Sequence, residues 1–203
     1  MLKSDFYNCA SKYSKDSEPI NQLWEEIEEA HSGTARYYHN LYHLQNLYND
    51  LAEVKGIIDD WHSIIFAITY HDYVYDTSRT DNEELSAEIA VKRLLSINYP
   101  AGKISRCKAH ILATKGHRQT EDNDTNLFTD ADLSILGADW ETYKQYAENI
   151  RKEYNNMAGF NMGRKNVLIN FLKMPRLFKT DYFYSQYEAI ARENIQREIV
   201  ELL

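Results

Sequence analysis

The stretch IIDDWHSIIFAITYHD, residues 57–72, says most about the fold of this chain. Its apolar residues recur at the spacing of one face of an α-helix. These residues are Trp61, Ile64, Ile65 and Ile68. A buried helix of this kind would end at His71 and Asp72, where an unpaired carboxylate is costly unless a metal ion or an arginine compensates its charge. The stretch therefore predicts a core helix with polar chemistry at its C-terminal end.

Helical spacing of apolar residues continues on both sides of this stretch. A helix start is indicated at Ser17, which is followed by Pro19, and Asp81 with Glu84 has the spacing of a capping box. Residues 116–126 are polar and predict a flexible loop. Helices are expected from Ser17, at about 41–51, 57–72, 81–95, 101–114, 127–136, 139–156 and 164–173, and from about 185.

No internal repeat, low-complexity tract or linker-like change in composition divides the 203 residues. The chain has only three prolines and seven glycines, which disfavours a loop-rich or sandwich architecture. Its length is sufficient to bury a substantial core. We therefore expect a single all-α domain over residues 1–203, a helical bundle with its core at about 20–178 and a C-terminal helix at about 185–203.

Composition excludes several classes of protein. The net charge of −8 disfavours a dedicated nucleic-acid binder, which normally presents a basic face. The two cysteines, Cys9 and Cys107, fit neither a disulfide framework nor a zinc knuckle, so both are expected to be reduced thiols. The sequence shows neither a secretory leader nor a run of about 18 apolar residues. The expected location is cytoplasmic, away from membranes, and the oligomeric state stays open, a homo-oligomer included.

Metal-ligand residue types recur along the chain at His43, at the adjacent pair His71 and Asp72, and at Asp132. Two imidazoles and two carboxylates form a mixed N/O shell that divalent ions such as Mn²⁺, Fe²⁺, Co²⁺, Ni²⁺ or Zn²⁺ accept. Adjacent helical residues differ by about 100° in direction, so His71 and Asp72 can share an ion only at their common edge. Asp130 lies about 200° from Asp132 on a helix, and we expect it to face water or the helix start.

Several phrases together resemble the HD-domain superfamily of metal-dependent phosphohydrolases, in particular a bacterial branch of predicted members. The phrases are RYYHNLYH at 36–43, AITYHDYVYD at 67–76, DNEELSA at 81–87, ILAT at 111–114 with His117, DADLSILG at 130–137 and IRKEY at 150–154. The similarity covers about Trp24 to Phe178. It implies an HD-type helical domain in which His43, His71, Asp72 and Asp132 hold one divalent ion, with Mg²⁺ among the candidates.

The other histidines have less specific patterns. His39 and His43 have the spacing of a zinc-protease helix, but Asn40 stands where that motif needs glutamate, so His39 is expected beside the ligands or at the helix start. Some HD proteins recruit two further histidines for a second metal, and His110 and His117 are compatible with this role. The alternative is a solvated helix end, with Asp122 and Asp124 as neighbours of a charged His117. His31 and His62 are expected to be structural or solvated.

Arg36 and Arg151 are the cations that we assign to a phosphate, because a planar guanidinium can bind two phosphate oxygens at once. Salt bridges to some of the 31 acidic residues are the alternative, and Lys115 is a weaker candidate. Sixteen tyrosines are present, and some either line the pocket or pack in the core. Those flanking the ligands are Tyr38, Tyr42, Tyr70, Tyr75 and Tyr154.

The resemblance implies hydrolysis of a nucleotide or another small phosphate ester by metal-activated water, with Asp72 essential. No Gly-rich phosphate loop, serine nucleophile elbow or Cys/His pair competes with this hypothesis. One alternative is a non-catalytic sensor that binds metal and nucleotide. Another is a di-iron oxygenase, which would require His110 and His117 as ligands.

Overall fold

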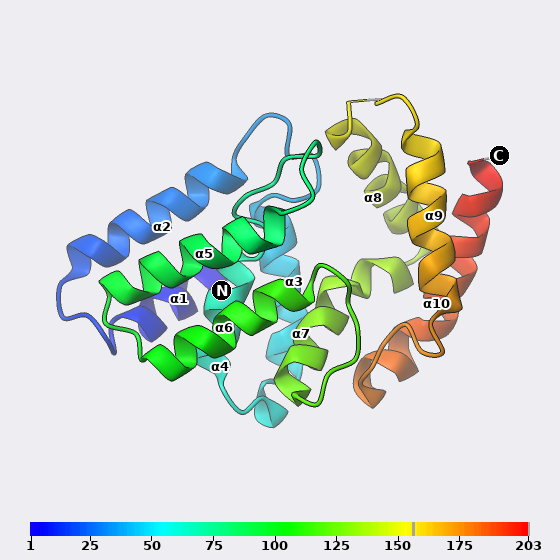
Figure 1. The fold of residues 1–203 in the computed structure, drawn as a ribbon. Coiled ribbons are helices and arrows are strands. Elements are labelled where there is room, and N and C mark those ends of the chain that lie inside the picture. Colours follow the sequence, from blue (N-terminus) through cyan, green and yellow to red (C-terminus); the bar gives the residue numbers. More distant parts are fainter. Residues whose placement is uncertain (156, 203) are drawn as a thin grey trace.

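The computed structural model describes residues 1–155 and 157–202, and every regular element in these two ranges is a helix. The elements are α1 (Leu2–Ala10), α2 (Ser17–His31), α3 (Leu41–Glu53), η1 (Lys55–Ile57), α4 (Trp61–Tyr70), α5 (Asn82–Ser96), α6 (Ala101–Ala113), α7 (Asn123–Asp132), η2 (Ser134–Gly137), α8 (Trp140–Glu153), α9 (Phe160–Lys173) and α10 (Asp181–Glu201), where η marks a 3-10 helix. The predicted all-α class is confirmed (Figure 1). Within the described ranges, none of these helices has both the length and the apolar character needed to cross a bilayer.

Side-chain caps set where several helices begin. Asp16, Asn40 and Asp139 each accept a backbone N–H from the first turn of α2, α3 and α8. The Asp60 side chain likewise accepts the backbone N–H of Ser63 in the first turn of α4. This cap explains why α4 begins at Trp61 rather than near residue 57. Asp122 caps α7, so this helix begins four residues earlier than predicted and the expected loop at 116–126 is helical from residue 123.

Other predicted boundaries also need correction. The capping box at Asp81 is not formed, because the Asp81 carboxylate pairs with Arg79 instead. Helix α8 ends at Glu153, and Asn156, its predicted last residue, lies outside the described part of the chain. Helix α10 begins at Asp181, earlier than the predicted 185, and residue 203 also lies outside the described part. Helix α1 was not predicted.

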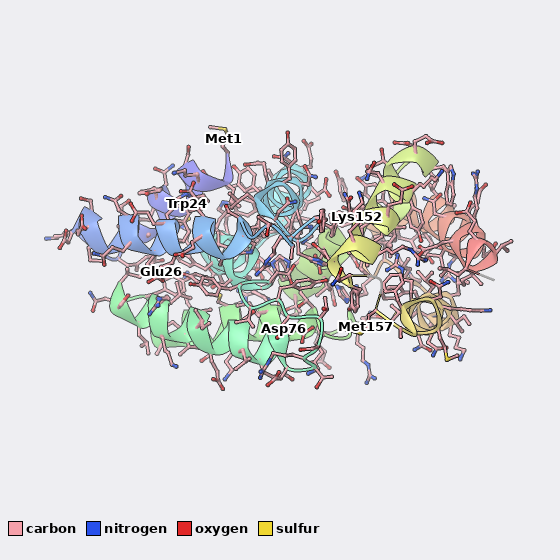
Figure 2. The ribbon with its side chains drawn as sticks, turned by 90° about the horizontal axis from the view of Figure 1, so that it is seen from above. Met1, Trp24, Glu26, Asp76, Lys152 and Met157 are labelled. Atoms are coloured by element: carbon pink, nitrogen blue, oxygen red, sulfur yellow. The ribbon has the colours of Figure 1, made fainter. Side chains whose placement is uncertain are left out.

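Helix α4 is the centre of the larger half of the molecule. Every residue from Ser63 to Tyr70 is buried, and α1, α3, α5 and α6 pack around it. Helices α2 and α5 run side by side in both views, and Glu26 of α2 pairs there with Arg93 of α5 at 2.6 Å (Figures 1 and 2). The two cysteines are free and buried, as expected for reduced thiols.

Helices α8, α9 and α10 lie together on the other side of α7 (Figure 1). Element η2 joins the two parts, and a Cβ atom at Gly137 would lie 2.5 Å from the Cβ of Tyr187 on α10. Only glycine permits this close approach. Phe6 of α1 and Phe183 of α10 belong to one continuous core, which therefore extends beyond the predicted 20–178 at both ends.

Candidate metal centre

Three helices bring the four predicted ligands together. His43 lies in the first turn of α3, where the Asn40 side chain accepts the backbone N–H groups of Tyr42 and His43. His71 and Asp72 follow the last residue of α4, and Asp132 is the last residue of α7. All four side chains are largely shielded from water, since Asp72 is the most exposed of them at 18%.

The ligand atoms lie at short distances from one another. The Nε2 atoms of His43 and His71 are 3.1 Å apart, and Asp132 Oδ1 lies 3.2 Å from the first and 3.6 Å from the second. Asp72 Oδ2 lies 2.9 Å from His71 Nε2 and 3.6 Å from His43 Nε2. The tightest group is formed by His43, His71 and Asp132, whose ligand atoms, one from each residue, all lie within 4.8 Å of one another. The four side chains lie close together, with Asp72 outside the tightest group, and their assignment as metal ligands stays a prediction.

The donor set fits a divalent ion. Two ligands at metal–ligand bonds of about 2.1 Å stand roughly 3.0–3.4 Å apart in octahedral or tetrahedral geometry, and the observed separations of 2.9–3.6 Å lie close to this range. His71 Nδ1 lies 3.0 Å from the carbonyl oxygen of Ile68. Because that carbonyl can only accept, Nδ1 carries a proton, and when the ring is neutral the lone pair of Nε2 is directed at the cluster.

Electrostatics at the cluster favour a cation. Burial opposes charge on Asp132, but hydrogen bonds from His117, His43 and His71 hold the pKa of this carboxyl well below its usual value. The pKa of Asp72 is also lowered, against burial, mainly by His71 and His39. Burial alone would lower the pKa of His71, yet Asp72 and Asp132 together raise it well above its ordinary value. The carboxylates therefore hold negative charge in a water-poor site and attract positive charge to it.

Glu153, which the sequence did not single out, pairs with His39 next to the predicted ligands. Glu153 at the end of α8 is buried, and its carboxylate accepts the backbone N–H groups of Tyr38 and His39 and also Nδ1 of His39, at 2.7–2.9 Å. The ring of His39 stacks on Tyr75 with centroids 4.2 Å apart. Burial opposes protonation of His39, but Asp72 and Glu153 raise its pKa overall. His39 therefore stands beside the ligands, and Glu153 holds it there.

The structure gives Arg36 a different contact from the predicted one. Its guanidinium donates to the carbonyl oxygens of His39, Asp72 and Tyr73 at 2.7–3.0 Å. These bonds tie the start of α3 to the end of α4 and so hold His43 close to His71. The terminal nitrogens of Arg36 bind backbone oxygens and the side chain does not line the cavity described below, so its observed contacts position the two helix ends. The phosphate role of Arg36 stays a prediction.

The two histidines considered for a second metal are separated. His110 is fully buried, with its Nδ1 atom 2.8 Å from the Thr125 hydroxyl, and it does not belong to the ligand group. His117 follows the end of α6 with a positive φ of 47°, and its Nε2 atom lies 2.9 Å from Asp132 Oδ2. The predicted neighbours of His117 are elsewhere, because Asp122 caps α7 and Asp124 binds the backbone of Asp59 and Asp60.

Asp130 does not face water as predicted. It is fully buried, and it accepts the backbone N–H groups of Lys179 and Thr180 just before α10. The ammonium group of Lys179 also contacts it at 2.9 Å and donates to the carbonyl oxygen of His117. Asp130 therefore fixes α10, and through Lys179 it also fixes His117, while Asp132 faces the cluster.

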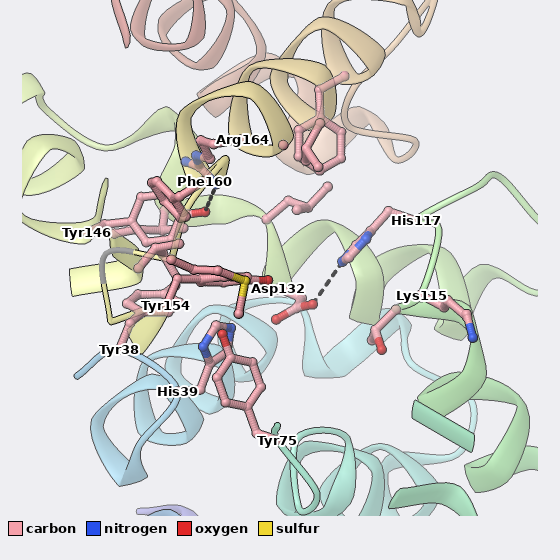
Figure 3. Close-up of a pocket in the computed structure, with 18 of the residues that line it drawn as sticks. Tyr38, His39, Tyr75, Lys115, His117, Asp132, Tyr146, Tyr154, Phe160 and Arg164 are labelled. Atoms are coloured by element: carbon pink, nitrogen blue, oxygen red, sulfur yellow. Dashed lines mark hydrogen bonds and ion pairs between the residues drawn. The ribbon is translucent and has the colours of Figure 1, made fainter. Parts of the chain in front are cut away.

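A cavity of about 540 Å³ opens beside the cluster, with Asp132, His117 and His39 in its wall (Figure 3). Of the five tyrosines considered, Tyr38, Tyr75 and Tyr154 line it, whereas Tyr42 is exposed and Tyr70 lies in the core. Arg151 lines two smaller hollows instead of this cavity and rests on the ring of Phe160, and its phosphate role stays a prediction. Lys115 reaches the rim of the cavity and pairs with Glu84.

Comparison with known proteins gives no relative: no family model, curated protein or solved structure matches the chain.

Proposed function

We propose that this chain is a divalent-metal-dependent phosphohydrolase that acts on a small phosphate ester. The observation that carries the proposal is the convergence of two imidazole nitrogens and two carboxylates from three helices beside a cavity of about 540 Å³. The order of these ligands along the chain and the phrases around them resemble the HD-domain superfamily. The volume of the cavity falls in the range of sites for small ligands, roughly 300–1,000 Å³.

His43, His71, Asp72 and Asp132 would hold the ion. When bound, a divalent ion supplies a water of lowered pKa and compensates negative charge on the phosphoryl oxygens. Hydrolysis joins the oxygen of water to phosphorus and breaks the ester P–O bond, and the departing alcohol takes up a proton. The chain's own residues orient the site for this reaction: His117 fixes Asp132, the Ile68 carbonyl fixes His71, and Arg36 holds the two helix ends together.

Apolar side chains form part of the wall of the cavity beside Asp132. Leu133 and Ile135 line the cavity from the end of α7 and from η2, Ile150 lines it from α8, and Val167 and Phe171 line it from α9. A site from which bulk water is largely excluded strengthens every charge interaction within it. We expect these side chains to limit the number of water molecules that can reach the phosphoryl group.

The test is metal analysis of protein purified without chelator, followed by a panel of phosphate esters assayed for phosphate release with Mn²⁺, Co²⁺, Ni²⁺ and Mg²⁺. Asp72→Ala should abolish the metal-dependent release and keep the helical circular-dichroism spectrum, because the core is built from other residues. Asp76→Ala, which removes an exposed carboxylate four residues away, is the matched control and should keep the activity. Wild-type release rates in Asp72→Ala would refute the proposal, and metal and nucleotide binding without any release would favour the sensor.

A further inference from the structure

Aromatic rings form most of the wall opposite the ligands. Tyr38, Tyr146, Tyr154 and Phe160 gather on one side of the cavity, facing Asp132 and His117 on the other (Figure 3). The rings touch one another: Tyr38 packs on Tyr146 with centroids 4.7 Å apart, and Tyr154 packs on Phe160 at 5.2 Å. A wall of this kind offers π-faces to a flat group inserted beside it.

The positive charges that line the cavity are already paired within the described part of the chain. Arg164 makes two bonds to Glu198 at 2.8 and 3.0 Å, and its side chain is only 8% exposed. Lys115 binds Glu84 and the carbonyl oxygen of Thr80. The two lining histidines are paired in turn, His39 with Glu153 and His117 with Asp132.

The lining also contains Glu83, a further acidic group at the cavity. Of the four predicted ligands only Asp132 lines the cavity, so positive charge would enter it from a divalent ion held beside Asp132. A single phosphate group can bind there as a ligand of one divalent ion. A di- or triphosphate would place its additional negative charge against apolar rings or near Glu83, where no unpaired cation among the residues of the wall offsets it.

From these two observations we infer that the occupant of the cavity is a phosphate monoester with an uncharged, planar aromatic group. Its single phosphate lies at His43, His71, Asp72 and Asp132, and its ring lies against Tyr154 and Phe160. The inference rests on the proposed hydrolysis and narrows it: chains of two or three phosphates are disfavoured by charge, and sugar phosphates without a ring leave the aromatic wall uncovered.

The test compares three probes with the full-length protein and saturating Mn²⁺: adenosine 5′-monophosphate, adenosine 5′-triphosphate and ribose 5-phosphate. Stacking of one base on an aromatic side chain changes binding by roughly tenfold or more. We therefore expect kcat/KM for the monophosphate to exceed that for ribose 5-phosphate by at least about tenfold. The triphosphate should be hydrolysed more slowly than the monophosphate.

Phe160→Ala is the variant that reports on the ring. It should lower kcat/KM for the monophosphate. The ratio of this kcat/KM to that for ribose 5-phosphate should then fall close to one. Met162→Ala is the matched control, because Met162 lies on the same helix, is 72% exposed and does not line the cavity; the ratio should stay as in wild type. A titration of tyrosine fluorescence with adenosine, which has no phosphate, should saturate in the wild type and weaken in Phe160→Ala.

The outcomes separate the two proposals. Equal kcat/KM for ribose 5-phosphate and the monophosphate would overturn the aromatic part of the inference and leave hydrolysis standing. A triphosphate hydrolysed as fast as the monophosphate would overturn the argument from charge. No phosphate release from any probe, together with saturable adenosine binding, would refute the hydrolase and retain the aromatic site.

Discussion

Removal of the Asp130 carboxylate is expected to destabilise this protein more than removal of any exposed carboxylate. Asp130 is fully buried and accepts four donors: the backbone N–H groups of Lys179 and Thr180, the Thr180 hydroxyl and the Lys179 ammonium group, at 2.7–2.9 Å. The side chain of Lys179 is itself only 3% exposed. Asp130→Ala would leave a buried ammonium group without its carboxylate and two backbone N–H groups without their acceptor.

The size of the effect follows from this burial. Breaking a buried ion pair by removing one partner costs about 3–5 kcal/mol, because the remaining charge stays desolvated. In a chain of this length each kcal/mol lowers Tm by roughly 2–4 °C, so Asp130→Ala should lower Tm by roughly 6–20 °C. The helix content below the transition should be preserved, because the carboxylate acts between α7 and α10 and not within either helix.

The assay is thermal unfolding followed by circular dichroism at 222 nm, with Asp181→Ala as the matched control. Asp181 also lies at the start of α10, but it is 96% exposed and pairs with Arg176 at the surface, so its removal should change Tm by about 2 °C or less. If Asp130→Ala unfolds within about 2 °C of the wild type, the buried network does not stabilise the fold and the argument fails.

Two further predictions concern the metal. His117→Ala should leave about one equivalent of transition metal per chain and weaken the metal affinity by roughly 10–100-fold, because His117 orients Asp132 from outside the ligand group. Two equivalents of iron in the wild type that fall to one or none in the variant would contradict this prediction and favour the oxygenase. Metal affinity should rise with pH, because the pKa of His71 is raised above its ordinary value of about 6.5 and the ion must displace that proton. Equilibrium dialysis between about pH 5.5 and 9 measures this dependence, and an affinity that stays constant through the neutral range would refute it.

The fold could be predicted from the sequence where local patterns determine it. The apolar stripe of α4 and the capping residue Asp139 at the start of α8 act within a few positions of themselves, so they leave a clear periodic or positional signal. Helix α1 gave too short a stripe to be recognised, although Phe6 is fully buried in the core. The boundary of α7 was misplaced because Asp122, its cap, lies inside a polar run that resembles a loop.

Part of the candidate site could be predicted from the sequence for the same reason. Helix phase separates Asp132 from Asp130 and correctly directs Asp132 toward the cluster, since both residues belong to one helix. The role of Asp130 depends on Lys179, 49 residues further along the chain, and no spacing within α7 could indicate it. The position of His117 depends on the same lysine, which binds its carbonyl oxygen across 62 residues. Contacts made between distant segments leave no periodic signal.

Glu153 shows where a signal was present and could have been used. It shares one face of α8 with Tyr146 and Ile150, at intervals of seven and three residues, and this is the face that packs inward. A carboxylate on an apolar face requires a compensating partner. Its partners are the backbone and ring of His39, and His39 lies four residues before the first ligand, so the end of α8 and the start of α3 are joined at the rim of the cavity. The same bonds hold Tyr146 of α8, and Tyr154 just after it, opposite Asp132, and the proposed substrate requires both sides of the cavity.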